Sequence, residues 1–334
     1  MGGNGPGGLA WLQKGVVMQA EALLREGKLD ECVAALAGQI RSKPQDPKLR
    51  IFLFQLSVVM GQWDRAIDQL DIAAQMDPAA ELMAQVCRPA IQCERFRQEV
   101  FAGQRTPLVI GQPEEWLAHL IQAAMLSGQG KEDAAAELRT KALDAAPTTS
   151  GTIQLAAPKG SPADPQIVPI DWICDEDLRL GPVLEAIIEG KYYWVPFNNI
   201  LMIEIDPPAD LRDMVWAPAR IILAAGGEKV ALIPTRYPGS EAANQPAQVR
   251  LAKTTVMGGA DGETPFGIRE WKTDQDVYSL FQIASIKLGD PEKLREAMTD
   301  VHTKRAEEMR AKLVASGALK TGMPGGPVEG GGNG

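Results

Sequence analysis

The sequence predicts an α+β protein, in which an all-α domain of tetratricopeptide-like repeats precedes a mainly antiparallel α+β domain. Glycine and proline recur with a 34-residue period in the first half of the chain. A proline-rich stretch interrupts this pattern near the middle, and short β-rich runs follow it. We therefore expect four parts: a helical domain (1–147), a linker (148–169), an α+β domain (170–289), and a charged helix with a disordered glycine-rich tail (290–334).

The helical repeats are marked by a glycine and, seventeen residues later, a proline. These pairs are Gly27 with Pro44, Gly61 with Pro78, and Gly130 with Pro147. Glycine permits the tight turn after the first helix of a unit, and proline ends the second helix. Trp63 is expected to be buried in the joint between two helices. Residues 81–113 fall between the second and third pairs, and we expect an irregular helical unit there.

The first helix of each repeat is expected to line a concave groove. In that register four apolar side chains point into the groove, with polar neighbours beside them: Val17, Leu24, Ile51 and Val58, flanked by Lys14, Glu21, Lys48 and Gln55. An apolar groove edged by polar groups suits an amphipathic helix. The same side chains could equally pack on the irregular unit, and the sequence leaves both possibilities open.

The second half of the chain is predicted to begin with a short helix at 177–190, with Pro182 in its first turn and Gly190 as its C-cap. The acidic run at 175–177 would then complement the helix dipole. Six strand-like runs follow, at 192–196, 200–205, 219–225, 229–235, 249–256 and 279–288. Gly226 and Gly227 indicate a hairpin, and residues 290–316 read as one charged helix.

The aromatic run at 191–197 and the arginine Arg236 each allow two interpretations, one structural and one functional. In the run at 191–197, alternation sends Tyr192 and Trp194 to one face of a strand and Tyr193 to the other. We favour a structural strand, and the alternative is that Tyr193 contributes to a partner surface. Arg236 could clamp an anion or tie down a loop through backbone hydrogen bonds, and we favour the second.

Composition argues against several classes of function. A net charge of −9 disfavours nucleic-acid binding and docking to anionic lipid, and no apolar run is long enough to span a membrane. The beginning of the chain lacks the features of a secretory signal, so we expect a cytoplasmic protein. The four cysteines form no CxxC pair, there are only two histidines, and no phosphate-binding or nucleophile motif occurs. We therefore expect no metal, no cofactor and no enzymatic activity.

Several long segments, in order, resemble one known family. They are "RIFLFQLSVVMGQWDRAIDQLDIAAQMDP", "EVFAGQRTPLVIGQPEEWL", "APTTSGTI", "DLRLGPVLEAIIEGKYYWVPF", "LRDMVWAPAR" and "ALIPTRYPGSE". Over about residues 18–285 the chain is similar to the ImpE/SciE/TagJ family, which comprises accessory proteins of bacterial type VI secretion. The chain departs from the family pattern in a longer linker, glycine-rich ends and the helix at 290–316.

The resemblance implies a non-enzymatic adaptor that binds the N-terminal helix of the small sheath subunit. It also implies a link to the ClpV-type AAA+ unfoldase that recycles contracted sheath. The residues expected to contact a partner are those of the groove and of the β-domain face, namely Val17, Leu24, Ile51, Gln55, Val58, Tyr193 and Arg236. The alternatives are a repeat scaffold of another bacterial complex, and a small-molecule enzyme that uses Arg236 and Tyr237.

Overall fold

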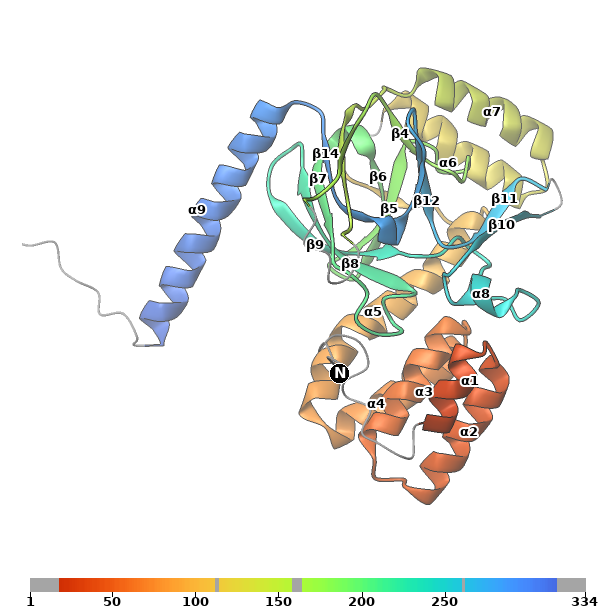
Figure 1. Ribbon diagram of the computed structural model, residues 1–334. Coiled ribbons are helices and arrows are strands. Elements are labelled where there is room, and N and C mark those ends of the chain that lie inside the picture. Colours follow the sequence, from red (N-terminus) through yellow and green to blue (C-terminus); the bar gives the residue numbers. More distant parts are fainter. Residues whose placement is uncertain (1–17, 112–113, 158–163, 260–261, 317–334) are drawn as a thin grey trace, which may run out of the picture.

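The computed structural model describes residues 18–111, 114–157, 164–259 and 262–316, with helices in the first half of this part of the chain and strands in the second (Figure 1). The helices of the first half are α1 (Met18–Arg25), α2 (Leu29–Ser42), α3 (Pro47–Val59), α4 (Trp63–Met76), α5 (Pro78–Phe101), α6 (Glu115–Gly128) and α7 (Glu132–Ala145). The predicted α+β class, with a helical region before a mainly antiparallel sheet domain, is confirmed.

Three helical hairpins, α1–α2, α3–α4 and α6–α7, turn at glycines that the sequence singled out. Gly27, Gly61 and Gly130 have φ angles of 76°, 66° and 72°, in the left-handed region that glycine enters without steric cost. Each hairpin therefore reverses direction within a three-residue connection.

The segment expected to be an irregular unit is mostly one long helix, α5, of 24 residues. Asp77 caps its first turn by accepting a hydrogen bond from the Ala79 amide at 2.9 Å, and Pro89 lies inside the helix. Figure 1 shows α5 running from the hairpins α1–α4 to the sheet. α5 therefore connects the two halves of the molecule.

The second half is built on a nine-stranded sheet with the order β1-β6-β5-β9-β8-β7-β14-β2-β3. Only its edge pair, β1 with β6, is parallel; the other neighbours in this sheet are antiparallel. Its strands are β1 (Leu108–Val109), β2 (Gly151–Leu155), β3 (Ile167–Ile170), β5 (Val183–Ile188), β6 (Lys191–Pro196), β7 (Ile200–Ile205), β8 (Trp216–Leu223), β9 (Glu228–Pro234) and β14 (Ile283–Leu288).

Two smaller sheets and a short helix complete the domain. One sheet pairs β10 (Thr255–Gly258) with β11 (Thr264–Gly267). The other has the order β13-β12-β4, from Val277–Ser279, Glu270–Thr273 and Ile173–Asp175. The short helix α8 (Ala247–Arg250) occupies part of the run at 249–256 that was predicted to be a strand, so only its end is β structure.

The helix predicted at 177–190 is wrong, because this segment forms β5 and its turn. All six residues of β5 are buried. One face of the strand belongs to a hydrophobic cluster that it shares with the helices, and the other face belongs to a second cluster formed by strands of the same domain. A strand buried on both faces carries a continuous apolar run, which periodicity cannot distinguish from a buried helix. Gly190, at φ 72°, belongs with Glu189, at φ 52°, to the two-residue hairpin turn between β5 and β6.

The segment predicted as a linker also contributes to the sheet. Within 148–169, β2 pairs with β14, and β3 pairs with β2. The intervening residues 158–163 lie outside the described part. The two strands are short and lack a strong alternating pattern. The prolines around them therefore led to the prediction of a linker.

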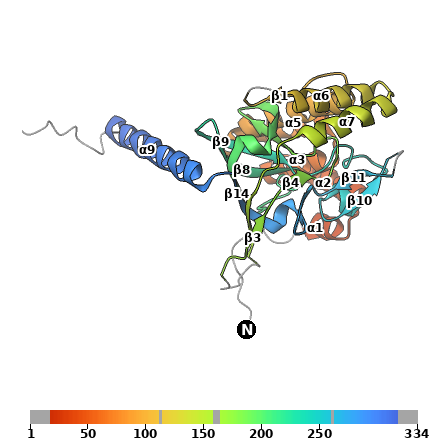
Figure 2. The ribbon, with the colours of Figure 1, turned by 90° about the horizontal axis from the view of Figure 1, so that it is seen from above.

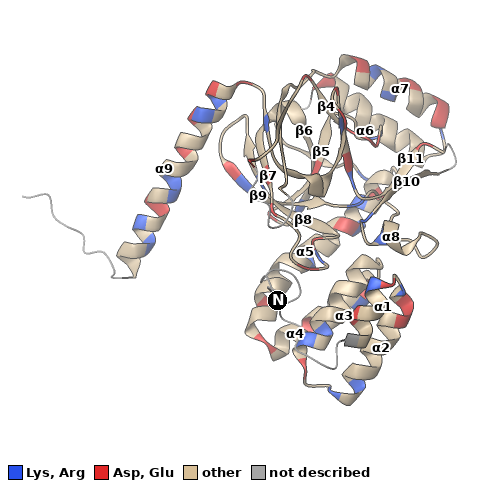
Figure 3. Ribbon diagram, viewed as in Figure 1, with Lys and Arg blue, Asp and Glu red and all other residues tan. Residues whose placement is uncertain are grey.

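The predicted charged helix is present as α9 (Pro291–Ala315). Its first turns pack through Leu294 and Met298 on a small cluster that includes Met202 and Ile222. Val301 is also buried, and Arg305 pairs with Glu228. The rest of α9 projects from the side of the sheet, with charged residues along its length (Figures 1, 2 and 3). The tail predicted to be disordered lies outside the described residues. None of the helices in the described ranges is long and apolar enough to cross a membrane.

Candidate partner-binding site

A network of buried ion pairs joins α5 to the sheet. Arg97 donates from Nε to Oε1 of Glu185 at 2.6 Å and from Nη2 to Oε2 at 2.8 Å, and Arg269 pairs with the same carboxylate. Burial alone would raise the pKa of Glu185, but the two guanidinium groups lower it to about 2. Asp175 pairs with Arg269, so the acidic run does not cap a helix as predicted. Guanidinium groups therefore occupy both carboxylates of this network.

Arg236 is buried and bonds to the end of a helix. Its Nη1 donates to the carbonyl oxygen of Val59 at 2.7 Å and to that of Arg250 at 2.5 Å. The last carbonyls of a helix lack partners within the helix and carry partial negative charge, which favours a cation there. Burial lowers the pKa of Arg236 to about 10, so the group is still charged at neutral pH. The structure supports the backbone-tying interpretation, and it corrects the placement of Arg236 on a partner-facing surface, since the residue is 4% exposed.

The residues predicted to line the groove do not form an open surface. Val17 lies outside the described residues, while Leu24 and Ile51 are partly buried. Gln55 is 2% exposed and Val58 is fully buried. The structure therefore supports the other possibility that the sequence left open, in which these side chains pack inside the protein.

The β domain causes this burial, because its segment 236–252 lies against the helical turns. A Cβ atom on Gly27 would lie 3.1 Å from the Cβ of Ala247, and one on Gly61 would lie 2.5 Å from the Cγ of Glu241. One hydrophobic cluster contains residues of α1–α7 together with residues of β5, β6 and β8. The end of α3 is thus enclosed by the second half of the chain, which the repeat pattern could not reveal.

The aromatic strand β6 has the alternation that the sequence predicted. Tyr192 and Trp194 belong to the core on the helical side, where Phe96 of α5 packs edge-on against the Tyr192 ring at 6.1 Å. Tyr193 is half-buried against the core on the other face. Leu108, on β1, is its partner in the parallel ladder. The structural role of this strand is therefore clear, and Tyr193 offers a partner only part of its side chain.

Trp63 is 8% exposed, as expected for the first residue after an inter-helix turn. Its ring stacks on Trp216 of β8 with a centroid separation of 6.5 Å. The indole nitrogen of Trp216 donates to Oε1 of Glu94 at 2.9 Å. Trp63 therefore links the second hairpin to the sheet as well as to its own helices.

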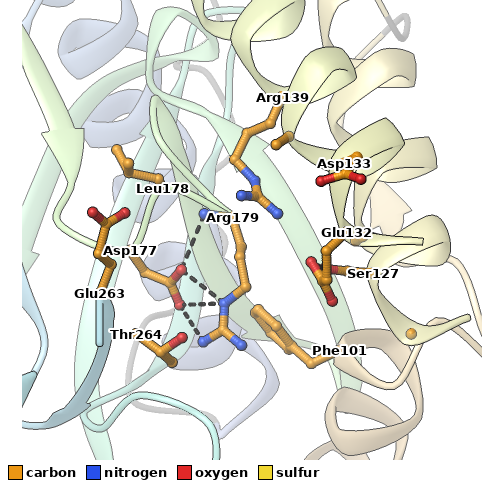
Figure 4. A pocket seen from close by; sticks show the side chains of 13 residues that line it. Phe101, Ser127, Glu132, Asp133, Arg139, Asp177, Leu178, Arg179, Glu263 and Thr264 are labelled. Atoms are coloured by element: carbon orange, nitrogen blue, oxygen red, sulfur yellow. Dashed lines mark hydrogen bonds and ion pairs between the residues drawn. The ribbon is translucent and has the colours of Figure 1, made fainter. Parts of the chain in front are cut away.

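A polar cleft of about 630 Å³ lies between the hairpin α6–α7 and the loop that precedes β5 (Figure 4). In it, Asp177 holds Arg179 through contacts as short as 2.6 Å, and the Arg179 guanidinium stands 4.8 Å from the centre of the Phe101 ring. The Ser127 hydroxyl donates to Glu132 at 2.6 Å. No histidine or cysteine is among the described residues that line this cleft.

Two exposed aliphatic side chains, Leu82 and Val86, lie on one face of α5, outside the groove predicted from the sequence. We define the α5 stripe as Leu82, Val86, Pro89, Cys93 and Phe96. Their spacing of four, three, four and three residues keeps them on one face of a helix. Leu82 is 68% and Val86 54% exposed, whereas Cys93 is 4% exposed. The stripe therefore begins in solvent and ends against the sheet.

A crevice of about 410 Å³ receives the C-terminal end of the α5 stripe. Its walls include Gln92, Phe96, Leu108, the turn residue Gly190, and Lys191 and Tyr192 of β6. The turn at Gly190 lies on Pro89 and Cys93, and it therefore separates this crevice from the exposed Leu82 and Val86. The spacing of the stripe is visible in the sequence, but a proline usually indicates the end of a helix, so Pro89 divides the pattern into two shorter segments.

Among the residues that the structure describes, no group of three or more His, Cys, Asp and Glu side chains could hold a metal ion. Burial raises the pKa of Cys32, Cys93 and Cys174 to about 12, so these thiols are neutral at physiological pH.

Comparison with known proteins identifies the family. The family described as "ImpE protein" matches residues 168–287. The type VI secretion system accessory component TagJ of Pseudomonas aeruginosa is 44% identical over 275 residues, which cover 82% of this chain and 92% of TagJ. The chain belongs to the ImpE/SciE/TagJ family. The resemblance noted from the sequence motifs is thereby confirmed.

A solved structure has the fold of this ImpE-family chain. The crystal structure of protein VPA1032 from Vibrio parahaemolyticus matches with a TM-score of 0.71 and 21% sequence identity, covering 83% of this chain and 99% of the other. At this identity the likeness concerns the fold alone.

Proposed function

We propose that this protein is a non-enzymatic accessory component of a type VI secretion machinery. The observation that carries the proposal is its 44% identity, over 92% of the relative's length, to a type VI secretion system accessory component. The occupied buried carboxylates and the cleft without a histidine or cysteine support a role in binding. We also propose a cytoplasmic location, as expected from the cysteines and other features of the sequence.

The proposed partner is the small subunit of the contractile sheath, bound through its N-terminal helix. The exposed apolar surface of α5 supports this proposal, because an amphipathic helix needs such a surface. By presenting or protecting this helix, the protein would assist sheath assembly or sheath recycling by the ClpV-type AAA+ unfoldase.

The test is a pull-down with the purified full-length chain and the small sheath subunit of the same organism. Two versions of the subunit are compared, one intact and one without its N-terminal helix, and the unfoldase is tested separately. Retention of the intact subunit alone supports the proposal. Retention of neither version would remove the sheath function and leave the more general role of a scaffold.

A further inference from the structure

We propose that the polar cleft between the hairpin α6–α7 and the loop before β5 binds a linear zwitterion, which carries a carboxylate at one end and an ammonium or guanidinium group at the other. Free lysine and arginine belong to this class of ligand, and so does the end of a peptide that terminates in one of them. Such a site is independent of the proposed sheath function.

Arg139 of α7 lines the cleft without an ionic partner. No carboxylate of the described residues lies within ion-pair distance of its guanidinium group, and its buried Nε–H has no hydrogen-bond acceptor among them. A buried donor without an acceptor costs free energy, which a ligand oxygen would recover. A carboxylate matches the planar fork of a guanidinium group, so Arg139 supplies the contact for the anionic end of the ligand.

The second arginine of the cleft is already neutralised. Asp177 holds Arg179 at 2.8 Å from Nε to Oδ1 and at 2.6 Å from Nη2 to Oδ2. The guanidinium group of Arg179 also stands over the Phe101 ring (Figure 4). Arg179 therefore forms a fixed wall of the cleft, and Arg139 has the positive charge that is left for a ligand.

Asp133 provides the opposite charge on the same helix. It lines the cleft and is exposed, and no described Lys, Arg or His pairs with it. The neighbouring Glu132, in contrast, already accepts a hydrogen bond from Ser127. Asp133 is therefore the contact for the cationic end of the ligand.

The spacing along α7 sets the length of the ligand. Asp133, Ala136 and Arg139 follow one another at intervals of three residues, and all three line the cleft. Six residues of an α-helix rise by about 9 Å, which is too far for the adjacent ammonium and carboxylate groups of a short amino acid. The two charges of the ligand are therefore separated by several methylene groups, which Ala136 and the Phe101 ring can contact.

The balance of charge in the cleft disfavours other anions. Carboxylates outnumber guanidinium groups among the lining residues, which include Glu132, Asp133, Asp177 and Glu263 against Arg139 and Arg179. A negative excess repels phosphates and dicarboxylates. A ligand with a single carboxylate and at least one positive group matches this balance.

The experiment titrates the full-length chain with L-lysine, L-arginine and ε-aminocaproate and follows the midpoint of thermal unfolding, which rises when a ligand binds the folded state. Two analogues of lysine are the matched controls, because norleucine lacks the side-chain ammonium group and cadaverine lacks the carboxylate. The three ligands should raise the midpoint, and each analogue should require a roughly tenfold higher concentration for the same rise.

Two variants connect this binding to the cleft. Arg139→Met and Asp133→Asn should each weaken the binding of ε-aminocaproate by roughly tenfold, because each removes one of the two charged contacts. Lys141→Met and Glu137→Gln should bind like the wild type, because these exposed residues of α7 do not line the cleft. The melting midpoint without ligand shows that each variant is folded.

Binding of the three ligands that is weakened in both cleft variants supports the site. A tripeptide of two alanines and a C-terminal lysine then identifies the source: tighter binding than free lysine indicates the end of a chain, and weaker binding indicates a small molecule. If none of the three ligands raises the midpoint, the site is wrong. It is equally wrong if norleucine and cadaverine bind as well as lysine, or if both folded cleft variants bind like the wild type.

Discussion

Arg97 and Glu185, which are 88 residues apart in the chain, form a two-point ion pair in which both side chains are almost fully buried. The pair connects α5 to β5, the third strand in the order of the large sheet. Arg97 also donates from Nη2 to the carbonyl oxygen of Arg236 at 2.8 Å, and Arg236 in turn holds the end of α3. One set of polar contacts therefore runs from the helical hairpins to strand β5 of the sheet.

We expect Arg97→Met to lower the free energy of unfolding by about 3–5 kcal/mol, because it removes one partner of a buried ion pair. Urea unfolding followed by circular dichroism measures the change. The control is Arg105→Met, because Arg105 is exposed and its pair with Glu99 should contribute less than about 1 kcal/mol. Equal stability of the two variants would contradict the importance assigned to the buried pair.

Acid should destabilise the protein through Glu185. Its pKa is about 2 in the folded protein and 4.5 without the surrounding charges, so its contribution is fully present above pH 4.5 and is lost as pH falls toward 2. We expect a loss of about 2 kcal/mol between pH 5 and pH 3 from this group. Glu185→Gln should show a shallower decline over the same window, and parallel curves for the two proteins would argue against the low pKa.

Trp63→Ala should cost about 3–5 kcal/mol, since a large buried side chain leaves a cavity between α4 and β8. The measurement is the midpoint of thermal and urea unfolding. Trp172→Ala is a suitable comparison, because Trp172 is only partly buried and should cost less. An unchanged midpoint for Trp63→Ala would contradict the stacking on Trp216.

Arg236→Met should destabilise the protein by about 1–3 kcal/mol, because the carbonyl oxygens of Val59 and Arg250 would be left buried without this donor. Hydrogen exchange should become faster in the last turn of α3. Arg236→Lys should recover only part of the stability, because an ammonium group lacks the planar fork of guanidinium. A variant with normal stability that fails to bind the partner would instead restore the partner-binding role predicted from the sequence.

The elements predicted correctly are those whose signals are local. The glycines at 27, 61 and 130 mark turns whatever the rest of the chain does, and the hairpin at Gly226 and Gly227 follows from two adjacent residues. The prediction for β5 was wrong because its signal is not local. Its uninterrupted apolar run is a consequence of burial on both faces, and that burial depends on helices more than 80 residues away.

The candidate site was predicted less well than the fold. The repeat register identified residues that face the concave side of a solenoid, but it could not include the segment 236–252 that encloses the end of α3. The ion pairs of Arg97 and Arg269 join segments that are far apart in the chain, so no local sequence pattern predicts them. The α5 stripe, in contrast, is a local pattern that could have been found by reading through Pro89 as a residue inside a helix.

The distance of 88 residues between Arg97 and Glu185 has a consequence during protein synthesis. At typical rates, the ribosome adds the residues between them in roughly 4–18 s. Throughout that interval, α5 lacks β5 and β6, and its inner face exposes apolar side chains and an Arg97 guanidinium that has Glu94 but not Glu185 as a partner. The nascent helical half is thus an aggregation-prone species that a chaperone would recognise. Expressing residues 1–147 alone would make this transient state permanent.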